Sequence, residues 1–143
     1  MTAPGPIHAT SIAIGGQVIL LMGSSGSGKS DLALRLIDRG AMLVSDDYTD
    51  IACRDGRLYA SPPLSIAGRM EVRHLGILAM PHVHNLPVAL VIRLDDKPER
   101  MPDRTARTDI MGTKLPVLCL DACEASAPIK VELALRTLAD IGQ

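Results

Sequence analysis

The apolar residues of this chain fall into short runs, and most of these runs have the length of β-strands. His8 to Ile14 and Val18 to Met22 are two such runs, and Gly15-Gly16 between them is typical of a tight hairpin turn. Asp31 to Gly40 differs, because its apolar residues recur at helical spacing and Gly40 can cap the helix end. The first forty residues therefore predict a β-hairpin followed by an α-helix.

The rest of the chain continues this alternation of strands and turns. The predicted elements are a strand at 41–45, a hairpin over 50–60 that turns at Asp55-Gly56, strands at 87–94 and 114–120, and a helix from a Ser126 cap to about Ile141. Pro116 predicts that the last strand lies near a sheet edge, because proline cannot donate to a sheet ladder. The segment that follows Asp95-Asp96 and runs to Thr108 is rich in Arg, Asp and Pro and is expected to be an exposed loop. With no internal repeat and no long linker, residues 1–143 are expected to form one α/β domain.

The turn between the second strand and the first helix carries the clearest chemical signal. It reads Gly-Ser-Ser-Gly-Ser-Gly-Lys-Ser from Gly23 to Ser30 and fits G-x-x-x-x-G-K-[ST], the phosphate-binding loop (P-loop). Glycines let the backbone take positive φ and approach a phosphate, while Lys29 is expected to neutralise phosphate oxygens and Ser30 to ligate Mg²⁺. The predicted nucleotide-binding residues are Gly23, Ser24, Ser25, Gly26, Ser27, Gly28, Lys29 and Ser30.

Two adjacent acids, Asp46 and Asp47, end the strand that follows the first helix. They lie 17 and 18 residues beyond Lys29, which places them on a neighbouring strand of the same sheet. Carboxylates beside a P-loop can hold Mg²⁺ and accept a proton from an attacking hydroxyl. We therefore expect a functional pair here rather than a solvated strand end.

Residues Arg69 to Leu78 allow two interpretations. Charged and apolar residues alternate before an apolar run, as in a strand with one face in water. Glu71 and Arg73 would also share a face, where an acid and a base side by side can serve a metal and a phosphoryl group. Periodicity does not choose between these interpretations. For His82 and His84, which have prolines around them and no third ligand nearby, a loop or a partly buried pair is favoured over a metal site.

Composition narrows the classes of partner. The chain is 47% hydrophobic but has no Phe or Trp and only Tyr48 and Tyr59, so binding of single-stranded nucleic acid by aromatic stacking is not expected. The net charge of −1 gives no general attraction for polyanions, so phosphate affinity must be local. No apolar stretch approaches the length of a membrane span, and no basic segment precedes an apolar run at the N-terminus. Neither nucleic acid nor a membrane is an expected partner.

The cysteines indicate a reducing compartment. Cys53, Cys119 and Cys123 are odd in number and lack a zinc-binding spacing, which favours free thiols in the cytoplasm. Cys119 and Cys123 are expected to be a core residue and a helix-end residue rather than a redox pair, because the C-x-x-C spacing is missing.

In order and spacing, these segments resemble the catalytic domain of bacterial HPr kinase/phosphorylase. The resemblance covers residues 7 to about 112 and rests on His8 before a hairpin, the P-loop, Leu43 to Asp47, and a Glu-x-Arg-x-x-Gly-Ile signature. The signature residues are Glu71, Val72, Arg73, Leu75 and Gly76. The resemblance implies an α/β P-loop nucleotide-binding domain of the HPr kinase/phosphoenolpyruvate carboxykinase-like type, with a mixed β-sheet flanked by helices. It also explains the hairpin that precedes the P-loop.

The resemblance also implies an activity and its residues. Members of this family use ATP and Mg²⁺ to phosphorylate a serine of the phosphocarrier protein HPr, and many reverse the reaction with inorganic phosphate. Asp46 matches the catalytic carboxylate, the base of the forward reaction, and Lys29 and His8 match further active-site positions. The implied metal ligands are Ser30 and Glu71, with Asp47 close by. Arg100 is the best match to a late catalytic arginine, with Arg104 as its rival.

Three departures from the family pattern qualify these expectations. The resemblance leads us to expect a short form, similar to that of alphaproteobacteria, without the amino-terminal domain of longer members. His74 stands where the signature has a glycine. Residues 115–124 contain no counterpart of the Pro-x-Pro-Gly-Arg-Asn segment implicated in phosphorolysis, so kinase activity is better supported than phosphorylase activity.

Two other functions remain open from the sequence. One is a small-molecule kinase of the shikimate or gluconate type, and the other is a non-catalytic module that senses nucleotide and binds a phosphotransfer partner. Members of the family that this chain resembles form hexamers, so the resemblance implies a cytoplasmic homo-oligomer.

Overall fold

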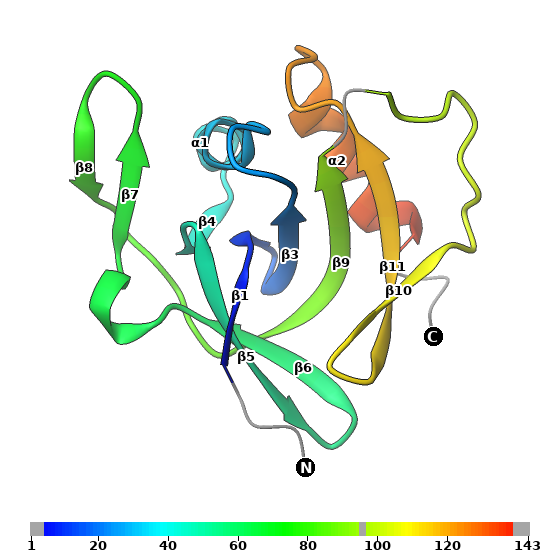
Figure 1. The fold of residues 1–143 in the computed structure, drawn as a ribbon, viewed down its shortest axis with the longest axis horizontal. Coiled ribbons are helices and arrows are strands. Elements are labelled where there is room, and N and C mark those ends of the chain that lie inside the picture. The colour runs from blue at the N-terminus through cyan, green and yellow to red at the C-terminus, as the bar shows by residue number, and fades with distance from the viewer. Residues whose placement is uncertain (1–4, 95–96, 139–143) are drawn as a thin grey trace.

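The computed structural model describes residues 5–94 and 97–138 (Figure 1). The strands are β1 (Gly5–His8), β2 (Thr10–Ile14), β3 (Gln17–Met22), β4 (Met42–Ser45), β5 (Tyr48–Arg54), β6 (Arg57–Ser61), β7 (Arg69–Val72), β8 (Gly76–Ala79), β9 (Leu86–Leu94), β10 (Arg107–Ile110) and β11 (Thr113–Leu120). The helices are α1 (Lys29–Asp38), α2 (Ala127–Leu138) and the short 3-10 helix η1 (Leu64–Ile66). The predicted end of the last helix near Ile141 falls outside the described residues.

The main sheet is mixed. Its strands follow the order β1-β5-β6-β9-β3-β2-β4, and β11 joins β9 while β10 pairs with β11. β3, β9 and β11 are parallel to one another, whereas every other pairing in this sheet is antiparallel. The predicted hairpins at Gly15-Gly16 and Asp55-Gly56 are both confirmed as tight turns between paired strands. The predicted α/β class is therefore confirmed, with β3 and its P-loop near the middle of the sheet.

The core explains why β3 is a continuous apolar run rather than an alternating one. Ile19 and Leu21 face α1 and α2, whereas Val18 and Leu20 face the layer formed with β1, β5 and β6. All four side chains are fully buried, because successive side chains of a strand project to opposite faces and both faces are covered here. The strand that carries the P-loop is thus held from both sides.

Helix α1 is bounded by two glycines in the left-handed region. It begins after Gly28 (φ 98°), two residues earlier than predicted, because the last residues of the P-loop are already helical. Gly40 (φ 109°) follows its end, where the amides of Gly40 and Ala41 donate to the carbonyls of Ile37 and Leu36. These two bonds form a Schellman motif and confirm the predicted glycine cap.

The two helices are tied together by an ion pair. Arg39 on α1 donates two hydrogen bonds to Glu132 on α2, at 2.9 and 2.8 Å. The hydrogen bond from Arg39 lowers the pKa of the Glu132 carboxyl, which keeps the carboxyl ionised to a lower pH than usual. Since both side chains are partly exposed to water, the pair is expected to contribute little to stability.

Residues 69–79 form a separate two-stranded hairpin, β7–β8, instead of the one alternating strand that the sequence suggested (Figure 1). The chain turns back at residues 73–75, and the Leu75 amide donates to the Val72 carbonyl at 2.9 Å. Arg73 therefore lies in the turn and not beside Glu71 on a strand face. His74 in this turn has φ 74°, the conformation that the signature glycine would take without strain.

Replacing His74 by glycine is expected to raise the free energy of unfolding by about 1 kcal/mol, because a side chain with Cβ is strained at positive φ. Urea denaturation of the variant measures the change. Arg73→Gly is the matched control, since Arg73 is outside the positive-φ region and glycine there should destabilise by about 0.5 to 1 kcal/mol. Equal changes in the free energy of unfolding of the two variants would contradict the proposed backbone strain at His74.

The end of β11 departs from the sequence expectation. β11 has β10 along its first half and β9 along its second half, and Pro116 lies at the last position of the β10 ladder, just before the β9 ladder begins. The predicted core position of Cys119 is wrong, because Cys119 is exposed. It projects from the face opposite Leu118 and Leu120, which pack toward the helices. Cys53, Cys119 and Cys123 are all free thiols.

Neither α1 nor α2 has the length and apolar composition needed to cross a bilayer, and the same holds for every helix in the described ranges.

Candidate active site

The P-loop follows directly from the end of β3. Gly26 (φ 82°) and Gly28 (φ 98°) take the left-handed conformation expected of them. Gly23 does not, and its role is spatial, because a Cβ there would lie 2.6 Å from the Ser27 hydroxyl oxygen. A Cβ on Gly28 would lie 2.9 Å from the Cβ of Ala122. The tight turn therefore needs glycine for conformation at two positions and for space at two.

The Lys29 side chain is folded back inside the P-loop. Its ammonium group donates to the carbonyls of Gly23 and Ser24 at 2.9 and 3.0 Å, and the residue is only 7% exposed. Ser27 Oγ is also buried and has no hydrogen-bond partner in the part of the chain that the structure describes. A buried cation and an unpaired hydroxyl within one loop fit a polyphosphate, which supplies only acceptors and negative charge.

Asp46 is buried among donors from three elements. Its Oδ1 accepts from the hydroxyls of Ser30, at 2.7 Å, and Thr10, at 3.2 Å, and its Oδ2 accepts from the amide of Glu71 at 3.1 Å. The residue is 7% exposed. Both carboxylate oxygens are thus engaged, and they connect α1, β2 and β7 at one point.

Asp47 has the opposite environment. Its φ of 68° turns the chain sharply after Asp46, and its side chain is 63% exposed. Its Oδ1 lies 3.1 Å from His8 Nε2 at the end of β1, and its own amide donates to Thr10 Oγ1 at 3.1 Å. The predicted pair therefore divides into one buried carboxylate held by donors and one accessible carboxylate beside a histidine.

Thr10 is the site residue that the sequence analysis missed. It is fully buried, donates to Asp46 and accepts from the amide of Asp47, so it fixes both acids relative to β2. A single threonine in a strand is what β-propensity alone favours, so the sequence contains no signal for this role.

The predicted metal ligands are brought only partly together. The Ser30 hydroxyl donates a hydrogen bond to Asp46. Glu71 contacts Asp46 through its backbone amide, and the Glu71 side chain is exposed. Within the described ranges, no three His, Cys, Asp or Glu side chains are grouped closely enough to hold a metal ion. The Ser30 hydroxyl and Asp46 carboxylate are hard oxygen donors of the kind that Mg²⁺ takes, and Mg²⁺ usually keeps several waters. His82 and His84 lie in the segment between β8 and β9, as expected.

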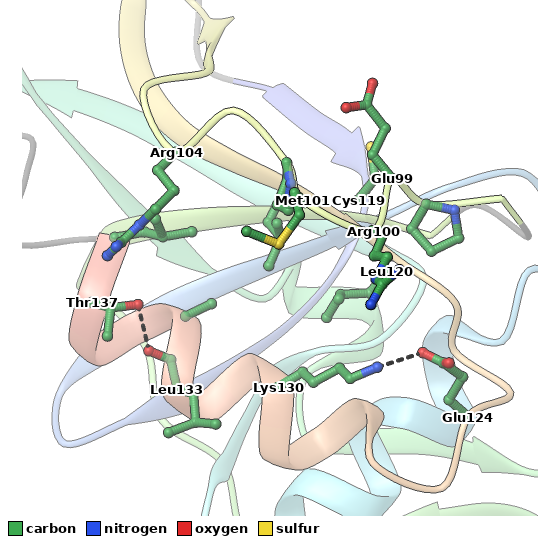
Figure 2. A pocket seen from close by; sticks show the side chains of 15 residues that line it. Glu99, Arg100, Met101, Arg104, Cys119, Leu120, Glu124, Lys130, Leu133 and Thr137 are labelled. Atoms are coloured by element: carbon green, nitrogen blue, oxygen red, sulfur yellow. Dashed lines mark hydrogen bonds and ion pairs between the residues drawn. The ribbon is translucent and has the colours of Figure 1, made fainter.

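Arg100 and Arg104 line a different pocket, which lies between the segment 98–104, the end of β11 and α2 (Figure 2). This pocket has a volume of about 540 Å³, and an ion pair between Lys130 and Glu124 lies at its rim. No hydrogen bond or ion pair in the described residues joins Arg100 to the P-loop or the acidic pair. The arginine that lines the cavity beside the P-loop is Arg93, at the end of β9.

A family model places residues 1–130 of the chain in a known group. The model is that of the HPr Serine kinase C-terminal domain, and it includes the P-loop, the acidic pair and the β7–β8 hairpin.

Individual relatives agree with that match. The chain is 42% identical over 87 residues to the HPr kinase/phosphorylase of Clostridium tetani, covering 61% of this chain and 28% of the relative. It is 34% identical over 126 residues to that of Brevibacillus brevis, covering 78% of this chain and 40% of the relative. The chain thus spans well under half the length of these curated relatives.

A solved structure shares the fold over nearly its whole length. The Hpr(Ser) kinase/phosphatase from Coxiella burnetii matches with a TM-score of 0.79 at 29% identity, covering 92% of this chain and 94% of that one.

Proposed function

Because the chain belongs to the HPr serine kinase C-terminal domain family, we propose that it transfers the γ-phosphoryl group of ATP to a serine of an HPr-type phosphocarrier protein, with Mg²⁺. One observation carries this proposal. The P-loop, with Lys29 folded inside it, lies beside one buried and one accessible carboxylate. Phosphoryl transfer needs a phosphate cradle, charge neutralisation and a group that receives the hydroxyl proton, and these residues provide all three.

Lys29 and the P-loop bind the phosphates. When bound, ATP and Mg²⁺ supply the phosphoryl group and neutralise charge on its oxygens. The ammonium of Lys29, which donates to two loop carbonyls here, would donate to phosphate oxygens when ATP is bound, and the P-loop amides would hold the remaining phosphate oxygens. Since the transition state is loose, this positioning is the main contribution of the loop.

The geometry favours roles for the two acids that are the reverse of those expected from the sequence. We propose that Asp47 accepts the proton of the acceptor serine, because it is exposed and His8 orients its carboxylate. Asp46 instead holds the Ser30 hydroxyl in position for Mg²⁺, and Glu71 is kept beside Asp46 by the hydrogen bond that its backbone amide donates to the Asp46 carboxylate. Arg100 has no role in this scheme.

The wider setting is also part of the proposal. We expect a cytoplasmic protein, in agreement with its three free thiols, and a homo-oligomer, a hexamer by family resemblance. The forward reaction is proposed alone, because residues 115–124 lack the segment implicated in phosphorolysis. Adding inorganic phosphate to serine-phosphorylated HPr tests the reverse reaction directly.

The direct test incubates the chain with Mg²⁺, ATP radiolabelled at its γ-phosphate, and purified HPr. Label is expected on a serine of HPr and is expected to be absent when that serine is replaced by alanine. Label that appears only on metabolites of a small-molecule extract would favour a small-molecule kinase. Binding of ATP without any transfer would favour the nucleotide-sensing module.

A further inference from the structure

The cavity beside the P-loop has a volume of about 530 Å³, which lies within the range of small-ligand pockets. Three segments line it: the P-loop up to Ser27, the end of β9 at Arg93 and Leu94, and the end of β11 with the turn that follows it. None of these residues beyond the P-loop has a role in the function proposed above.

The sheet brings these segments to one edge. Met22, Arg93 and Cys119 are register partners across the three parallel strands β3, β9 and β11. The arrowheads of these strands accordingly point the same way in Figure 1. In α/β sheets, ligands bind outside the carboxyl ends of the parallel strands, and the cavity lies at those ends.

The direction of the bound nucleotide follows from strand order. The acidic pair follows β4, which is reached from β3 through β2, so the reacting γ-phosphate must face that side. The other neighbour of β3 is β9, followed by β11. A nucleotide whose phosphates lie in the P-loop therefore extends its nucleoside toward β9 and β11, where the cavity is.

The far wall of the cavity is fixed to the P-loop before any ligand binds. Ala122 packs so close to Gly28 that a Cβ added to Gly28 would lie 2.9 Å from the Cβ of Ala122. Arg35 of α1 donates to the carbonyl of Ala122, and to that of Glu124 at 3.1 Å. The turn at residues 121–124 is thus held by the helix that the P-loop begins, and its position follows that of the phosphate site.

The side chains on this wall suit a sugar and a flat base. The guanidinium of Arg93 is held at 3.0 Å by the hydroxyl of Thr108, and a planar cation can stack on an aromatic base. Asp121 Oδ1 accepts from the amide of Cys123 at 2.9 Å, and its carboxylate is the kind of group that accepts hydrogen bonds from ribose hydroxyls. Stacking in this cavity must come from Arg93, since none of the described residues that line it is aromatic.

We infer that this cavity binds the nucleoside part of the nucleotide, with Arg93 against the base and Asp121 near the ribose. The inference rests on the proposed function for the phosphate end of the ligand. It adds a specificity-determining arginine that is separate from the phosphate-binding lysine.

Calorimetry with ADP and with inorganic pyrophosphate separates the two ends of the ligand. Arg93→Ala is expected to weaken ADP binding about fivefold to tenfold and to change pyrophosphate binding by less than about twofold. Lys29→Ala should weaken both ligands, and Arg57→Ala, an exposed arginine of β6, should weaken neither. An equal effect of Arg93→Ala on both ligands, or no effect on either, would overturn the inference. If neither ligand binds the unaltered protein, the proposed function fails first and this inference with it.

The thiols provide a second readout in the unaltered protein. Cys119 and Cys123 line the cavity, whereas Cys53 is an exposed thiol on β5. Saturating ADP is expected to slow alkylation of Cys119 and Cys123 by iodoacetamide several-fold, with pyrophosphate protecting much less and Cys53 unaffected, as measured by peptide mass spectrometry. Bound ADP that leaves both cavity thiols as reactive as before would place the nucleoside elsewhere.

Discussion

Replacing Asp47 by asparagine is expected to lower kcat for phosphoryl transfer to HPr by about 10² to 10⁴ and to leave ATP affinity within about twofold of its original value. The amide has the size of the carboxylate but cannot accept the proton of the serine hydroxyl. Asparagine also tolerates the left-handed φ of 68° at this position at least as well as aspartate, so the backbone should not change. Turnover of γ-labelled ATP and calorimetry of ATP binding measure the two quantities separately.

The matched control is Asp55→Asn. Asp55 is also an exposed aspartate at positive φ, 53°, but it lies in the β5–β6 hairpin turn. This variant should retain full turnover. Undiminished transfer by the Asp47→Asn protein would remove Asp47 from the chemistry and return the role of base to Asp46, as the sequence alone had suggested.

The two hairpins, the end of α1 and the P-loop could be predicted from the sequence because their signals are local. Gly15-Gly16, Asp55-Gly56 and Gly40 each sit where the backbone needs positive φ, so the two hairpins and the end of α1 could be located from residue types. The P-loop was predictable for the same reason, since glycine is required there for both conformation and space.

The different environments of Asp46 and Asp47, and the roles proposed from them, could not be predicted, because they depend on long-range contacts. What buries Asp46 is Thr10 from β2 and the amide of Glu71 from β7, which are 36 and 25 residues away in the chain. What exposes Asp47 is a left-handed turn at a non-glycine residue. Periodicity contains neither fact.

Arg93 and the β7–β8 hairpin were missed for related reasons. Arg93 is one charged residue at the end of a long apolar strand, and only the register of three parallel strands places it beside the P-loop. The β7–β8 turn has His74 where glycine would have marked a turn, so Arg69 to Leu78 resembled one strand.

Asp46→Asn is expected to destabilise the fold, in contrast to Asp47→Asn. An asparagine has only one accepting oxygen, so whichever way its amide is turned, either the amide of Glu71 or the hydroxyls of Ser30 and Thr10 lose the buried acceptor that the carboxylate supplies. A buried donor that loses its acceptor costs about 1 to 3 kcal/mol, and the free energy of unfolding should fall by that amount. At the exposed Asp47, the same substitution should change it by less than about 1 kcal/mol.

The functional consequence of Asp46→Asn should also differ in kind. Because Asp46 holds the Ser30 hydroxyl and anchors β7, its loss is expected to raise the Mg²⁺ concentration needed for half-maximal activity, with part of the turnover recovered at high Mg²⁺. Asp47→Asn should show no such recovery, since added metal cannot replace a proton acceptor. Denaturation curves and Mg²⁺ titrations of the two variants therefore separate a buried positioning carboxylate from an exposed base. If Asp46→Asn proves as stable as the unaltered protein and no excess of Mg²⁺ restores its turnover, the proposed exchange of roles is wrong.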